Sequence, residues 1–253
     1  MLSYLRVDPS KDHGHYALST RVLWVQKNMT SAYATITCGC GQVSLKFPNA
    51  SPKSRCGCCC TECLQRVYIG TNGTPPEPLK NLEEPLDLLY VDSQIMKPDE
   101  ETLSKLSVFM LNTDDAPNIN LRADCCGAVL LTENAEFHRP HTVATFNNLG
   151  EFLRCTFLEL PESRFNVFTK DWPPEKTQAL REREVAGTGT TSLQVPDPRE
   201  PVEEKEFLDG IAALQIEANP KPEDSISFAE LVAHMEMKVV NNFFSEARAM
   251  CPS

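Results

Sequence analysis

The sequence lacks a long apolar segment, and its beginning does not resemble an export signal. No apolar run approaches the roughly 20 residues that cross a bilayer as a helix. The first residues, 1–13, also lack a basic segment followed by an apolar core. We therefore expect a soluble, cytoplasmic protein that does not bind membranes.

Positive charge is also scarce. The chain has 24 Lys and Arg against 35 Asp and Glu, a formal net charge of -11. Residues 197–236 account for most of the excess, because they contain eleven acidic and three basic residues, a net -8. Nucleic-acid surfaces need clustered cations that displace counterions from phosphates. We expect no nucleic-acid partner, and the absence of a phosphate-binding glycine loop gives no support to nucleotide hydrolysis.

Cysteine, by contrast, is abundant and clustered. Seven of the eleven cysteines lie between Cys38 and Cys63. Such a density is typical of a disulfide framework or a soft-metal site. A chain of 253 residues with 41% hydrophobic content can bury a core without cross-links, and its number of cysteines is odd. We therefore expect reduced thiols that hold a metal ion.

Cys38 and Cys40 form a first candidate ligand pair. Residues two apart in a strand point to the same face, so both thiolates can reach one ion. A second pair should complete a tetrahedron. The cysteine cluster that remains outside residues 38–63 is Cys125-Cys126-Gly127, which resembles the end of a metal-binding knuckle.

Cys58, Cys60 and Cys63 form a C-x-C-x-x-C motif. Their thiolates can converge on one ion if the chain turns into a helix after Cys60. Three protein ligands leave a fourth position open, which is typical of catalytic zinc sites. Zinc with three thiolates has a formal charge of -1, so it should polarise water weakly and suit a thiolate better. Cys56 and Cys59 are spare thiols, and redox chemistry or metal buffering through them is an alternative.

Together these motifs resemble the glutathione-dependent formaldehyde-activating (GFA) family, which includes centromere-protein-V-like proteins. The resemblance covers about residues 33–146. It implies a small zinc-bearing antiparallel β-fold of the β-tent type and a carbon-sulfur lyase that acts on the adduct of glutathione with formaldehyde. It further implies that Cys38, Cys40 and Cys126 hold a structural zinc, and that Cys58, Cys60 and Cys63 hold a second zinc with an open site.

Two positions depart from the family pattern. The late knuckle is C-x-x-C-G in the family, but its first position here is Ala123. Either Cys125 or Asp124 would then have to supply the missing ligand. The family commonly has histidine inside the triple motif, where this chain has Cys59. The alternative to an enzyme is a non-catalytic interaction module that zinc only stabilises.

Short alternating apolar runs broken by turn residues predict a mainly antiparallel β-domain over residues 33–160. The expected strands are 42–47, 67–69, 86–91, 106–111, 127–132 and 142–146. Residues 1–32 form an N-terminal arm in this interpretation. Residues 161–203 are rich in proline and glycine, and we expect a largely irregular linker there.

Residues 204–253 are expected to form an acidic, helical C-terminal segment. Within it, residues 227–250 are predicted to be one helix, because Ser227 and Glu230 match a capping box and an apolar stripe follows at helical spacing. Such a stripe usually docks on its own domain. Its alternative use is to bind a protein partner.

Overall fold

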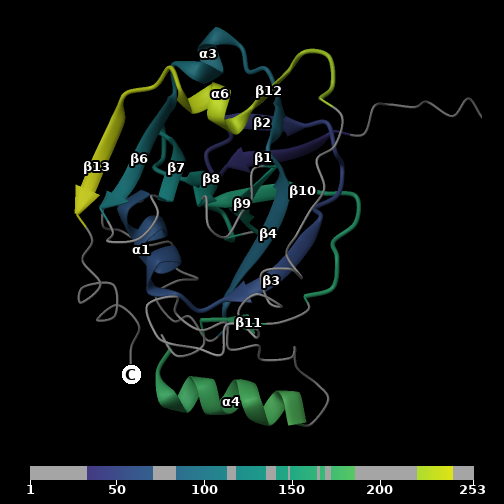
Figure 1. Ribbon diagram of the computed structural model, residues 1–253, viewed down its shortest axis with the longest axis vertical. Helices are drawn as coiled ribbons and strands as arrows, with labels where there is room; N and C mark the ends of the chain where they lie inside the picture. The colour runs from purple at the N-terminus through teal and green to yellow at the C-terminus, as the bar shows by residue number, and fades with distance from the viewer. Residues whose placement is uncertain are drawn as a thin grey trace, which may run out of the picture. The chain divides into compact units, whose positions relative to one another are not determined.

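The computed structural model describes residues 33–70, 84–112, 118–134, 141–147, 149–163, 166–168, 172–185 and 221–241 (Figure 1). These residues are mainly β, as the sequence predicts. The predicted N-terminal arm, residues 1–32, and residues 204–220 of the predicted helical C-terminal segment lie outside them. No helix among the described residues is both long enough and apolar enough to cross a membrane.

A three-stranded antiparallel sheet carries the first cysteine pair. Its order is β10-β1-β2, with β1 at Ala34–Cys38, β2 at Ser44–Phe47 and β10 at Leu153–Thr156. The sequence of β1 alternates, so that Ala34, Ile36 and Cys38 are all fully buried. This alternation points the thiol of Cys38 into the core at the end of the strand.

An eight-stranded sheet forms the larger part of the described fold, in the order β11-β3-β4-β9-β8-β7-β6-β13. The inner pairs are antiparallel, whereas β11 with β3 and β13 with β6 are parallel. The strands are β3 (Ser54–Cys58), β4 (Leu86–Asp92), β6 (Leu106–Asn112), β7 (Asn118–Ala123), β8 (Val129–Asn134), β9 (Thr142–Phe146), β11 (Asn166–Val167) and β13 (Met237–Asn241). The predicted strands at 86–91, 106–111, 127–132 and 142–146 correspond to β4, β6, β8 and β9.

Helix α1 (Thr61–Gly70) begins directly after Cys60, contains Cys63 in its first turn and packs on β8. The prediction of a strand at residues 67–69 is therefore wrong. The apolar run Val67-Tyr68-Ile69 is only the last turn of a helix that starts at Thr61, and Val67 is the member of the run that is fully buried. Gly70 ends the helix where a Cβ would lie 2.5 Å from the Val129 side chain.

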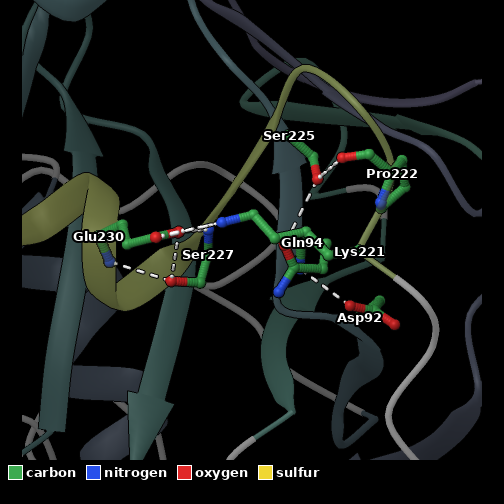
Figure 2. Close-up of polar contacts among 7 residues, drawn as sticks. All are labelled: Asp92, Gln94, Lys221, Pro222, Ser225, Ser227 and Glu230. Carbon is green, nitrogen blue, oxygen red and sulfur yellow. Dashed lines mark hydrogen bonds and ion pairs between the residues drawn. The ribbon is translucent and has the colours of Figure 1, made fainter.

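The C-terminal segment packs against the β4–β5 corner. Strand β12 (Ser225–Ser227) pairs with β5 (Gln94–Met96), and helix α6 (Phe228–Val232) follows. Figure 2 shows the contacts that fix it: Ser227 Oγ accepts from the Glu230 N–H at 3.1 Å, and the Glu230 carboxylate accepts from the Ser227 N–H at 2.7 Å. Lys221 pairs with Glu230 at 3.0 Å. The predicted capping box is therefore confirmed.

The prediction of one helix over residues 227–250 is wrong beyond Val232, where α6 ends, and from Met237 to Asn241 the chain forms β13 beside β6 (Figure 1). The β-branched pair Val239-Val240 suits a strand. Pairing with β6 supplies a hydrogen-bond ladder that local helical spacing cannot reveal, because β6 lies more than a hundred residues earlier in the chain. Residues 242–250 lie outside the described part.

Helix α4 (Pro174–Val185) replaces part of the predicted linker. Proline breaks a helix in its interior, but it is common at the first helical position, where its missing N–H is not needed, and Pro174 occupies that position here. Leu180 of this helix is buried with Cys59 and Trp172. The prediction of irregular structure is therefore wrong for residues 174–185, and residues 186–203 lie outside the described part.

Candidate metal centres

Four thiols meet at the end of β1. The sulfur of Cys38 lies 3.5 Å from that of Cys40 and 3.7 Å from that of Cys125, and the sulfurs of Cys40 and Cys125 are 3.3 Å apart. With Cys126, all four sulfurs lie within 4.8 Å of one another. Sulfurs at about 2.3 Å from a tetrahedral ion are separated by roughly 3.8 Å. The four-thiol cluster thus has the dimensions of a metal site.

The turn between β1 and β2 shapes one side of this cluster. The Val43 N–H donates to the sulfur of Cys38 at 3.3 Å, a hydrogen bond that stabilises a thiolate. Gly39 allows close approach of the chain, because a Cβ there would overlap the Glu151 carbonyl oxygen. Gly41 has a φ of +78°, which favours glycine. The glycines of the C-G-C-G motif therefore shape the turn that presents the two thiols.

A turn after β7 supplies the other two thiols, those of Cys125 and Cys126. Ala123 is the last residue of β7 and is fully buried. The next three residues form a turn instead of extended chain, so the adjacent Cys125 and Cys126 can both reach the cluster. Asp124 pairs with Arg122 at 3.1 Å and does not join it. Of the two substitutes that the sequence leaves open, Cys125 is the one near the other thiols.

Three further thiols meet where β3 ends and α1 begins. The sulfur of Cys58 lies 3.3 Å from that of Cys60 and 3.2 Å from that of Cys63. The Cys63 N–H points at the sulfur of Cys60, at 3.3 Å. Among the described residues, no histidine, acidic residue or further cysteine joins this three-thiol cluster. The helix that the C-x-C-x-x-C spacing requires is present, and a fourth coordination position has no protein ligand in this part of the chain.

The three-thiol cluster is more buried than the four-thiol cluster. Cys58 and Cys63 are 3% and 2% exposed, and Cys60 is half-buried. The thiols lie at the N-terminus of α1, where the helix dipole favours negative charge. Hydrogen bonds from Cys58 and Cys60, together with the charge of Arg66, hold the pKa of Cys63 well below its ordinary value. The environment therefore favours at least one thiolate before any ion binds.

Arg66 is a residue of this site that the sequence analysis missed. It lies on α1 one turn after Cys63, and its Nη2 donates to the sulfur of Cys63 at 2.5 Å. The side chain is buried, and burial acts to lower its pKa, but the three neighbouring thiols raise the pKa above the ordinary value. The i, i+3 spacing from the last cysteine is the signal that could have found it, once a helix was expected there.

Cys56 and Cys59 lie close in sequence to Cys58, Cys60 and Cys63 but do not join the three-thiol cluster. Cys56 is fully buried, and burial raises its pKa to about 12, so it stays a neutral thiol at ordinary pH. Cys59 packs with Trp172 and Leu180 and is not part of the three-thiol cluster. The motif therefore has the register Cys58-x-Cys60-x-x-Cys63.

All-sulfur donor sets suit a soft or borderline metal ion and not magnesium or calcium, which prefer oxygen. Both clusters therefore fit such an ion in spacing and in donor chemistry. A scan against protein-family models gave no match for this chain, and a search of curated proteins and one of solved structures gave none either.

Proposed function

We propose that this protein is a zinc-dependent carbon-sulfur lyase of the GFA type, acting on the adduct of a thiol such as glutathione with a small aldehyde. The observation that carries the proposal is the contrast between a four-thiol cluster and a three-thiol cluster without a fourth ligand among the described residues. Closed four-ligand zinc sites are typically structural, whereas sites with an open position are typically catalytic.

Zinc is the ion that these donors favour, because it accepts sulfur ligands in a tetrahedral arrangement and has no redox chemistry. Cys38, Cys40, Cys125 and Cys126 would hold the structural ion. The other ion would be held by Cys58, Cys60 and Cys63. Bound there, zinc would supply a Lewis acid that favours the thiolate form of a substrate sulfur.

The proposed reaction conserves electrons. In the breakdown direction, the bond between the sulfur and the hydroxyl-bearing carbon breaks, and the sulfur leaves with the electron pair. The hydroxyl group gives its proton to water and becomes the carbonyl of the aldehyde, so the products are the aldehyde, a thiolate and one proton. Formation of the adduct is the reverse. No oxidant or reductant is consumed, so a redox-inert ion is sufficient.

The contribution of the chain is electrostatic. Negative charge on sulfur grows as the carbon-sulfur bond breaks, and the site faces it with the N-terminus of α1 and with Arg66. Burial of Cys58 and Cys63 strengthens these interactions by excluding water. The half-buried Cys60 lies on the more accessible side of the cluster.

Metal analysis and turnover test the proposal. We expect two zinc equivalents in the wild type, and turnover of the glutathione–formaldehyde adduct. Cys60→Ser should lose about one equivalent and at least about 100-fold in turnover. Cys155→Ser is the matched control, because Cys155 lies on β10, bonds to the Phe146 carbonyl and belongs to neither cluster.

Two results would overturn the proposal. One is a zinc-loaded protein without turnover of any thiol–aldehyde adduct. The other is a zinc ion at the three-thiol cluster with four protein ligands, as measured by X-ray absorption spectroscopy. The alternative of an interaction module that uses residues 227–250 has less support, because Phe228, Leu231 and Val232 are buried in the core of this chain.

A further inference from the structure

Arg66 is an unusual residue to find buried. Its side chain is 4% exposed, and Nη2 contacts the sulfur of Cys63. Its Nε is buried and has no hydrogen-bond partner among the described residues. Burial of a cation is costly unless negative charge lies beside it. The placement of Arg66 therefore calls for an explanation in terms of the charge of the site.

The formal charges explain it. Three thiolates and one divalent ion sum to -1, and Arg66 brings the total to zero. When an anionic fourth ligand binds, the net formal charge of the site becomes -1 if Arg66 is present and -2 if it is absent. Concentrated negative charge is unfavourable in a buried site. A neutral fourth ligand changes neither total, so the presence of Arg66 matters most when the incoming ligand is an anion.

The four-thiol cluster provides a contrast. In the part of the chain that the structure describes, none of its thiols accepts a hydrogen bond from a buried cation. The nearby Arg154 is exposed and bonds to the Gly39 carbonyl. Cys40 and Cys125 of this cluster are themselves exposed, so water can offset their charge. A buried arginine on a thiol is thus a feature of the cluster with the open position.

We propose that Arg66 is a positioning residue that makes the open position of the three-thiol cluster selective for an anionic sulfur ligand over a neutral ligand. The inference rests on the proposed function and names its ligand class. Arginine suits this role because it stays charged at all relevant pH values and has several donors in a fixed plane. Nη2 donates to the sulfur of Cys63, and the buried Nε has no hydrogen-bond partner among the described residues.

The test uses full-length protein loaded with cobalt(II), whose absorption reports each added ligand without any turnover. Glutathione is the anionic probe, and imidazole is the neutral probe. The wild type should bind glutathione in preference to imidazole. Arg66→Gln should weaken glutathione binding about tenfold or more, the scale on which a neighbouring charge changes such equilibria, and change imidazole binding by less than about twofold.

Arg66→Lys is the matched control, because it keeps the charge. It should retain most of the preference for glutathione. An unchanged preference in Arg66→Gln, a preference lost in Arg66→Lys with cobalt still bound, or a wild type that binds imidazole but not glutathione would each overturn the inference.

A second variant covers the case in which Arg66→Gln fails to hold the ion. Glu62 lies on the same helix, and its carboxylate accepts from Asn118 at 2.7 Å. Its negative charge raises the pKa of Arg66, as the charges of the three thiols do, and so it offsets part of the positive charge of Arg66. Glu62→Gln should therefore strengthen the preference for glutathione severalfold, and an unchanged or weaker preference would contradict the inference. Absence of turnover with the preference intact would count against the proposed function alone.

Discussion

The two thiol clusters differ in how the chain builds them. The four-thiol cluster joins the β1–β2 turn to the turn after β7, so that Cys38 and Cys125 meet although they are 87 positions apart. The three-thiol cluster lies within six residues, at the junction of β3 with α1. The first has two exposed thiols, and the second has two that are almost fully buried.

Because of this difference, we expect the two clusters to contribute differently to stability and to ligand binding. An ion that joins two distant segments stabilises the folded state, because it closes a long loop that is open in the unfolded chain. An ion held by a local motif closes almost no loop. An ion in the four-thiol cluster should therefore act mainly on stability, and an ion in the three-thiol cluster should act mainly on ligand binding.

Cys38→Ser should have the largest effect on stability. It removes a buried ligand from the four-thiol cluster, and we expect Tm to fall by about 10 °C, since a structural metal contributes several kcal/mol and 1 kcal/mol shifts Tm by about 3 °C at this size. Cys60→Ser should lower Tm by less than about half as much. Thermal unfolding measures the two Tm values, and metal analysis measures the bound ions. A larger fall in Tm for Cys60→Ser than for Cys38→Ser would contradict the prediction.

Gly39→Ala should have the next largest effect. The added Cβ would meet the Glu151 carbonyl oxygen, a backbone atom that can move little, and the expected cost is about 1–3 kcal/mol. The four-thiol cluster should lose affinity for its ion while the three-thiol cluster keeps its own. Denaturant unfolding and metal analysis check this. Equal loss of metal from both clusters would show that they are not independent.

Cys59→Ala should have a small effect, although Cys59 is flanked by two ligands of the three-thiol cluster. Its sulfur packs with Trp172 and Leu180, so we expect about 1 kcal/mol of lost stability and no change in metal content. Denaturant unfolding measures the first and elemental analysis the second. Loss of a zinc equivalent would show that Cys59 is a ligand after all.

Glu230 should give the smallest effect, and it serves as a reference outside both clusters. Hydrogen bonding from the Ser227 N–H, aided by Lys221, lowers the pKa of Glu230 to about 2 from 4.5. Because the folded-state pKa is depressed, the stabilisation is present above pH 4.5 and is lost as the pH falls through about 2. Glu230→Gln should remove this pH dependence, as measured by NMR titration and amide exchange at α6, without any change in metal content.

Local patterns predicted β2, β4, β6, β8 and β9, but they missed β1, β3, β7 and β10 and predicted the C-terminal segment poorly. Burial alternates in the predicted strand β2, whereas β4 and β9 are buried at nearly every position and were found from short apolar runs between turn residues. In the C-terminal segment, Met235 and Val239 match a helical stripe, yet the chain forms β13 because β6 offers an edge to pair with. A pairing between residues so far apart leaves no trace in local spacing.

The sequence by itself determined the three-thiol cluster, because C-x-C-x-x-C followed by a helix brings the thiols of Cys58, Cys60 and Cys63 together with few degrees of freedom. Only the tertiary structure decided the rest. It brought the turn after β7 to the end of β1, so that Cys125 and Cys126 lie beside Cys38 and Cys40, and it enclosed Arg66 beside Cys63. Local backbone geometry decides which side chains close in sequence can converge. Burial and strand pairing decide which side chains far apart in sequence they then contact.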